Sequence, residues 1–181
     1  MCSGIAEVVR DDAINAYADG KLVYVTTGML RFANDEELQI VLGHEIAHNA
    51  ERHIEAKQKN AGWGALLGAV ADVALATQGV NTQGAYTQQF SQLAGMSFSQ
   101  DFEREADYVG SYILARAKLP TDRAPLFWRR MAAESPGSIK FASSHPTSTE
   151  RFVRLGQYHS EIRAKLTGGT ALVPNMKKDQ R

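Results

Sequence analysis

The chain has 181 residues, 44% of them hydrophobic, and its 20 basic side chains balance 20 acidic ones. This length suffices for one sizeable hydrophobic core but is short for two, so we predict a single domain over residues 1–181. No run of Lys and Arg is interleaved with aromatic residues, which argues against nucleic acid as a partner. The sequence also contains no signal segment and no run of 18 apolar residues, so no bilayer-spanning segment is predicted.

Two short strands are predicted near the N-terminus, over residues 4–9 and 21–27, where hydrophobic residues gather. Between them, Asp19 and Gly20 form a pair that favours a tight hairpin turn. The chain is therefore expected to open with a small β-sheet.

A long helix is predicted over residues 35–59. Asn34 can cap its first turn, and Glu37, three residues later, can complete a capping box. Further helices are predicted near residues 99–118, near residues 122–134 and after residue 150. The predicted fold class is α+β, mostly helical, with the small sheet near the N-terminus.

Residues 61–95 differ in character from the rest of the chain. Their first half is apolar and rich in Gly and Ala, with Asp72 as its only charge, and their second half is polar. We predict an excursion that acts either as a lid or as a core helix followed by a surface loop. A buried helical stripe would consist of Leu66, Leu67, Val70, Val73 and Ala74. At the other end of the chain, residues 174–181 are predicted to form a disordered tail.

The stretch that carries chemistry is "VLGHEIAHNA", in which His44 and His48 lie one helical turn apart on the same face. Two imidazole nitrogens at this spacing can bind one zinc ion, at about 2.1 Å each. Glu45 follows the first histidine and is placed to act as a general base on zinc-activated water. The alternative is that the two histidines share a helix by chance. The apolar residues around them favour a shielded zinc site.

A third ligand has to come from elsewhere in the chain. The histidine that completes a metzincin site would occupy the position of Ile54, and His53 lies one residue short of it. Glu103 is the best candidate, because it shares a helical face with Asp107 four residues later. Asp107 could then fix a ligand histidine from behind, while Glu105 points away. The alternative for this segment is a solvated acidic face.

These motifs resemble the gluzincin metallopeptidases of the HtpX and CAAX prenyl protease kind, including soluble envelope members related to BepA and LoiP. Residues 14–30 are similar to the family's strand segment before the active-site helix, and His145-Pro146-x-x-x-x-Arg151 is similar to its downstream motif.

The resemblance covers residues 14–53, 101–110 and 143–155. The sequence "YADG" stands where the family usually has Pro-Gly-Gly. Most members also have an N-terminal segment before the sheet, so we expect an excised catalytic core that lacks a signal, an anchor or a further domain.

The resemblance implies a zincin-like domain with one Zn²⁺ per chain and polypeptide substrates. The strand at residues 22–27 would lie beside the cleft and pair with an extended peptide. His145 would either stabilise the oxyanion or occupy the open zinc position, and Arg151 would brace the fold or the site. From the residues alone, the segment around His145 is equally typical of a helix start. His53 and His159 are interpreted as structural or exposed.

The sequence thus predicts a zinc endopeptidase that hydrolyses unfolded or misfolded proteins. One alternative is a chaperone-like binding protein with a largely latent zinc site, and another is a zinc hydrolase that acts on non-peptide bonds. The resemblance implies a bacterial cell envelope or periplasmic location. Association with a membrane or an envelope complex would use the missing N-terminal segment or residues 61–76.

Overall fold

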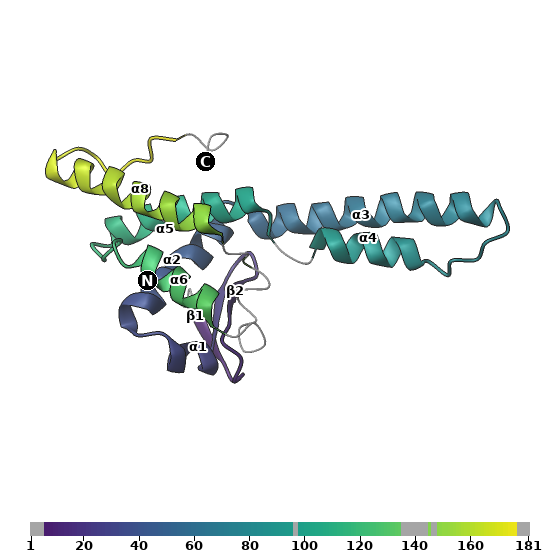
Figure 1. The fold of residues 1–181 in the computed structure, drawn as a ribbon, viewed down its shortest axis with the longest axis horizontal. Coiled ribbons are helices and arrows are strands. Elements are labelled where there is room, and N and C mark those ends of the chain that lie inside the picture. The colour runs from purple at the N-terminus through teal and green to yellow at the C-terminus, as the bar shows by residue number, and fades with distance from the viewer. Residues whose placement is uncertain (1–5, 96–97, 135–144, 146–147, 177–181) are drawn as a thin grey trace.

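The computed structural model describes residues 6–95, 98–134, 145 and 148–176. Helices dominate, and a small sheet lies near the N-terminus (Figure 1), as the sequence predicts. The elements, in chain order, are β1 (Ala6–Val9), β2 (Ala16–Ala18), β3 (Val23–Thr26), α1 (Thr27–Phe32), α2 (Asp35–Ala50), α3 (His53–Ala76), α4 (Ala85–Gly95), α5 (Gln100–Arg116), α6 (Ala124–Ala133) and α8 (Thr149–Thr167).

The three strands lie in the order β1-β3-β2, with β1 parallel and β2 antiparallel to β3. The predicted turn is present: the carboxylate of Asp19 accepts hydrogen bonds from the amides of Lys21 and Leu22, and Gly20 has a φ of 98°. The turn joins β3 to β2, a strand that was not predicted. The two predicted strands are therefore not hairpin partners but parallel neighbours.

The capping box at the start of α2 is confirmed. The Asn34 side chain accepts from the Glu37 amide, and the Glu37 carboxylate accepts from the Asn34 amide. The single helix predicted over residues 35–59 is wrong, because α2 ends at Ala50 and α3 begins at His53. Between them, Arg52 adopts a left-handed conformation with a φ of 61°, which breaks the helix and redirects the chain.

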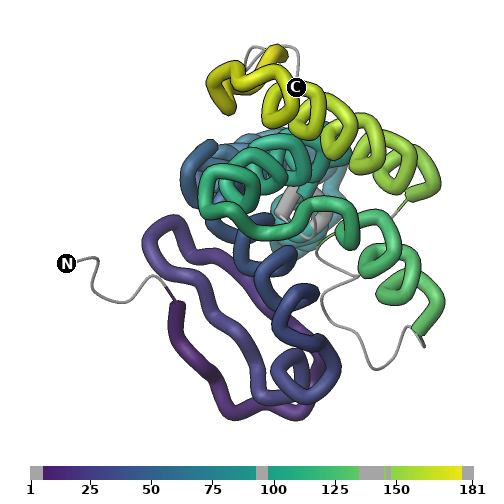
Figure 2. The backbone as a smooth tube through the Cα atoms, turned by 90° about the vertical axis from the view of Figure 1, so that its left-hand side faces the viewer, coloured from purple at the N-terminus to yellow at the C-terminus, as the bar shows by residue number. Residues whose placement is uncertain are grey.

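Helices α2 and α5 cross at two glycines. A Cβ atom at Gly110 would lie 3.0 Å from the carbonyl oxygen of Gly43, and one at Gly43 would lie 3.1 Å from the Leu114 side chain. The absence of side chains at these two positions lets the helix backbones approach closely. Figure 2 shows α2 between the sheet and α5, with α8 on the outer side of α5. This arrangement places one face of α2 directly against α5.

The hydrophobic core joins residues of the sheet, α1, α2, α5, α6 and α8. Its large members are Met29, Ile40, Tyr108, Tyr112, Leu114, Phe127, Trp128, Met131, Leu155, Tyr158 and Ile162. Among the described helices, none combines the length and the apolar character needed to cross a membrane.

Beyond α8 the chain returns to this body. The amides of Asn175 and Met176 donate to the hydroxyl of Tyr108, at 2.7 and 3.1 Å. Residues 177–181 of the predicted disordered tail lie outside the described part of the chain.

Helices α3 and α4 form a hairpin arm that projects from the body (Figure 1). The predicted core-helix stripe is wrong: Leu66, Leu67, Val70 and Val73 are 53%, 64%, 62% and 64% exposed. Asp72 fastens α3 to α4, because its carboxylate accepts hydrogen bonds from the hydroxyls of Thr82 and Thr87 and from the Thr87 amide. These bonds lower the pKa of Asp72 to about 2, so the carboxylate stays charged. The expected excursion is therefore a helical hairpin.

The close contact of the arm depends on Gly68. A Cβ atom there would lie 2.3 Å from the carbonyl oxygen of Tyr86, so Gly68→Ala should push α4 away at a local cost of about 1–3 kcal/mol. We expect faster amide exchange in α4 and faster proteolysis between residues 77 and 92. Gly62→Ala is the matched control, because nothing lies within 4 Å of its Cβ position. Equal behaviour of the two variants would contradict this account.

Candidate metal centre

Four buried side chains from three segments converge on one point. His44 and His48 come from α2, Glu103 comes from α5, and His145 precedes α8 in the chain. One ligand atom from each lies within 4.8 Å of all the others, and each residue is at most 2% exposed. The structure therefore brings together the three expected ligands and adds a fourth donor atom, a ring nitrogen of His145.

The spacing of these atoms suits a tetrahedral ion. The Nε2 atom of His44 lies 3.0 Å from Nε2 of His48, 3.2 Å from Nδ1 of His145 and 3.4 Å from Oε2 of Glu103. Nδ1 of His145 lies 2.9 Å from Oε1 of Glu103. Ligand atoms about 2.1 Å from a tetrahedral zinc ion are separated by about 3.4 Å. Two imidazoles, a carboxylate and a third imidazole are also ligand types that zinc accepts.

Glu45 lies beside this cluster without belonging to it. Its side chain is fully buried, and neither carboxylate oxygen has a hydrogen bond among the described residues. Nε2 of His145 lies 3.4 Å from Oε1 of Glu45. Burial raises the pKa of Glu45, although the charges of His145 and His44 oppose this. A buried carboxylate of this kind is available to accept a proton from a group bound at the cluster.

Asp107 stands behind His44, with Oδ1 3.0 Å from the ring nitrogen Nδ1 that faces away from the cluster. Burial alone would lower the pKa of His44, but the carboxylates of Glu103 and Asp107 raise it to about 9. The geometry matches the placement expected of a group that orients a ligand histidine.

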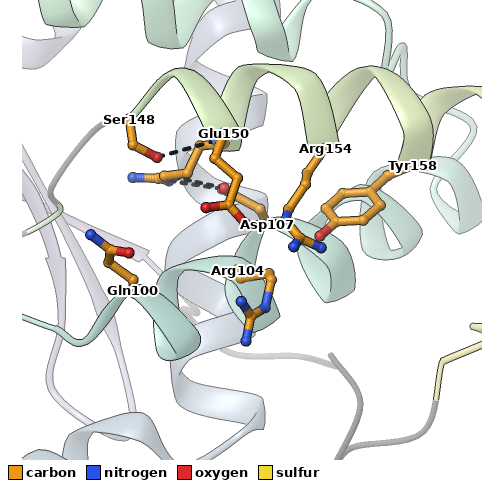
Figure 3. A pocket seen from close by; sticks show the side chains of 8 residues that line it. Gln100, Arg104, Asp107, Ser148, Glu150, Arg154 and Tyr158 are labelled. Atoms are coloured by element: carbon orange, nitrogen blue, oxygen red, sulfur yellow. Dashed lines mark hydrogen bonds and ion pairs between the residues drawn. The ribbon is translucent and has the colours of Figure 1, made fainter.

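Arg151 ties the two carboxylates of α5 to α8. Its guanidinium donates to both oxygens of Asp107, each at 2.8 Å, and Nη1 lies 2.8 Å from Glu103. Burial opposes the charge of Glu103, yet His145, His44 and Arg151 hold the pKa of that carboxyl well below its usual range. Figure 3 shows Asp107 on the wall of a pocket that Ser148 and the first turns of α8 complete. Pro146, the second residue of the expected His-Pro motif, lies outside the described residues.

The sequence assigned no functional role to His53 or Glu105, and the structure shows both side chains buried and in contact. His53 is 1% exposed, and its Nδ1 lies 3.0 Å from Nδ1 of His48. Glu105, which was expected to point away, is buried, and its Oε2 lies 3.0 Å from Nε2 of His53. The sequence offered one signal for this contact, a third histidine five residues after His48. In an unbroken helix that histidine would have pointed away from His48.

A cavity opens beside the cluster, between β2 and the start of α3. It is lined by Tyr17, Ala18, Ile54, Lys57, Gln58, Ala61, Phe98 and His145. The expectation that residues 22–27 supply the free strand edge is wrong, because β3 is paired on both sides. Among the described strands, β1 and β2 form the two edges of the sheet, and it is β2 whose Tyr17 and Ala18 line the cavity.

Several known proteins are similar to this chain. The mitochondrial metalloendopeptidase OMA1 of Schizosaccharomyces pombe is 32% identical over 167 residues, which cover 87% of this chain and 47% of that protein. The beta-barrel assembly-enhancing protease of Yersinia pestis is 32% identical over 136 residues, covering 71% of this chain and 28% of that protein. The chain thus spans half or less of the length of these relatives.

The comparison with protein families agrees with the geometry. The model of peptidase family M48 matches residues 4–159, a stretch that contains all four residues of the cluster together with Glu45. The chain belongs to peptidase family M48.

Proposed function

We propose that this chain is a zinc-dependent endopeptidase that cleaves unfolded or misfolded polypeptides. The observation that carries the proposal is a set of four buried donor atoms within 4.8 Å of one another, with the buried carboxylate of Glu45 beside it, 3.4 Å from His145. His44, His48 and Glu103 would hold the ion. Zinc in such a site supplies Lewis acidity, which makes water more acidic and polarises a carbonyl group.

The residues divide the remaining work. Glu45 takes a proton from the attacking water and returns it to the leaving amine, a role that suits a carboxylate whose pKa is raised by burial. Asp107 orients the His44 ring, and Arg151 holds Asp107 and Glu103 in place.

His145 supplies the fourth donor atom, at the coordination position that substrate or water would need. Its Nδ1 lies 3.2 Å from Nε2 of His44 and 2.9 Å from Oε1 of Glu103, close to the separation of two atoms that bind the same zinc ion. Of the two roles expected from the sequence, this position favours a resting state in which His145 closes the site.

The substrate would bind along β2. An extended peptide can pair with the free main-chain edge of β2, beside the cavity that leads to His145. Main-chain pairing does not read side chains, so cleavage would depend more on an unfolded backbone than on sequence.

The exposed apolar arm favours a second candidate, a chaperone-like protein with a largely latent site. Trp63, Leu67 and Val70 are each more than 60% exposed, and residues 60–100 contain one charge, Asp72. Such a surface suits unfolded chains, a membrane or an envelope complex. A cell envelope location is part of this proposal, supported by the similarity to beta-barrel assembly-enhancing proteases. Suppression of aggregation without any cleavage would favour this candidate.

The first test concerns the base. Glu45→Gln should retain zinc but lower the turnover of casein by at least about a hundredfold, because proton transfer is lost. Zinc content is measured by elemental analysis of the same preparation. Glu36→Gln, at an exposed position of the same helix, should behave as wild type. Near-normal cleavage by Glu45→Gln would refute the mechanism.

The second test separates a ligand from its neighbour. Glu103→Ala should lose the metal, whereas Asp107→Ala should keep it with affinity or activity lowered about 10 to 100-fold. Competition with a coloured chelator measures both affinities. If Asp107→Ala loses zinc as completely as Glu103→Ala, the assignment of the two carboxylates is wrong.

The third test asks whether His145 blocks the fourth coordination position. His145→Ala should leave the zinc content unchanged and raise the turnover of casein several-fold, because the site is opened. A fall in turnover with zinc retained would instead assign His145 to stabilisation of the oxyanion. An unchanged rate would make its position purely structural.

A further inference from the structure

A chain of contacts leads from the candidate metal cluster through His53 to a second buried acid, Glu105. Nε2 of His48 faces the cluster, while Nδ1 of the same ring lies 3.0 Å from Nδ1 of His53. The other nitrogen of His53 lies 3.0 Å from the carboxylate of Glu105. The three side chains are 0%, 1% and 7% exposed. Solvent is therefore largely excluded from the whole path.

The break between α2 and α3 creates the first of these contacts. In an unbroken helix, a residue five positions after His48 would lie about 140° around the axis from it. Arg52 has a left-handed backbone conformation, which interrupts the helix before that position is reached. His53 is therefore the first residue of α3, and its ring contacts that of His48. A strained non-glycine conformation at this point is consistent with a functional demand on the local backbone.

The donors and acceptors along the path admit one arrangement that leaves His48 able to bind a metal. A carboxylate accepts, so Nε2–H of His53 donates to Glu105. In a neutral His53 ring, Nδ1 is then an acceptor, and it takes a hydrogen bond from Nδ1–H of His48. His48 consequently presents the lone pair of Nε2 to the cluster.

The reverse arrangement works against metal binding. If Nδ1 of His53 donated, Nδ1 of His48 would have to accept, and a neutral His48 would carry its proton on Nε2. That proton would point at the other donor atoms of the cluster, where a metal ligand requires a lone pair. Only the arrangement anchored by an acceptor at Glu105 leaves that lone pair free.

Two phenylalanines prevent the rings from turning. Phe98 stacks on His48 with ring centroids 4.0 Å apart, and Phe102 stacks on His53 at 4.5 Å with an interplanar angle of 15°. Rotation of either ring out of its plane would break this stacking, and a 180° flip would exchange ring nitrogens for carbons and break the nitrogen contacts. The path is thus fixed in geometry as well as in hydrogen bonding.

We propose that His53 and Glu105 are positioning residues that hold His48 in the tautomer able to bind a divalent metal. This inference rests on the proposed zinc site. Asp107 contacts the far nitrogen of the His44 ring directly. In the proposed relay, Glu105 acts on the far nitrogen of the His48 ring in the same way, through hydrogen bonds that pass through the His53 ring.

His53→Phe tests the relay, because the ring can still stack on Phe102 while both nitrogens are removed. We expect zinc affinity, measured by chelator competition, to fall about 10 to 100-fold. His159→Phe is the matched control, since His159 contacts Thr121, which the cluster does not include. Its zinc affinity should equal that of the wild type. An unchanged affinity in His53→Phe would overturn the relay.

Conservative variants separate positioning from packing. His53→Gln keeps an acceptor and a donor and should recover most of the zinc affinity, whereas a purely packing role predicts no recovery. Nitrogen NMR of the zinc-loaded wild type should show the proton of His48 on Nδ1, and this proton should lose its hydrogen-bonded shift in His53→Phe. A His48 that carries no proton on Nδ1 would overturn the proposal even if His53→Phe fails to fold.

These outcomes are distinct from failure of the peptidase proposal. Zinc affinity and ring protonation are measured without any substrate, so the relay can fail while Glu45-dependent cleavage stands. Conversely, a wild type that binds zinc but cleaves nothing would remove the endopeptidase and leave the relay intact.

Discussion

The crossing of α2 and α5 is the contact on which the rest of the site depends. Gly43 and Gly110 let the two backbones meet, and the residues of the candidate site follow from that point along both helices. His44 and His48 occupy the facing side of α2, while Glu103 and Asp107 occupy the facing side of α5. A side chain at the crossing would separate the helices and draw the carboxylates away from the imidazoles. The sheet, α6 and α8 pack around this pair of helices, and the four residues of the cluster are shielded from solvent.

The four buried acids fall into two groups: Asp107 and Glu105 contact histidine rings on the side away from the cluster, and Glu103 and Glu45 lie at the cluster itself. Asp107 lies directly behind the ring of His44, and Glu105 lies behind the ring of His48 with His53 between them. Glu103 enters the donor set, and Glu45 lies beside it without a hydrogen bond among the described residues. Arg151 neutralises part of this charge, with contacts to Glu103 and Asp107 and its guanidinium 4.8 Å above the Trp128 ring. The four carboxylates can lie close together because each has a basic side chain beside it: Arg151 contacts Glu103 and Asp107, and His53 and His145 lie next to Glu105 and Glu45.

Local periodicity was sufficient to predict the parts of the site that lie on one helix. The spacing of His44 and His48, the pairing of Glu103 with Asp107 and the capping box at Asn34 all follow from one helical turn. The break at Arg52 has no such signal, because a non-glycine residue rarely adopts a positive φ and the flanking sequence favours helix. The arm was misjudged for a related reason. A helical apolar stripe looks the same whether it faces a core or projects from the body, and only the tertiary contacts decide.

The brevity of β2 has a consequence for how the molecule behaves among other chains. An unpaired strand edge is a template for any extended backbone, including that of a second copy or of an aggregating neighbour. β2 has three residues, a length of about 10 Å, so it can align a few peptide units but cannot seed a growing sheet. In the proposed function, this edge would align one short segment of an extended substrate beside the cavity. Backbone groups that are already paired inside a folded protein could not pair with this edge, whereas those of an unfolded segment could.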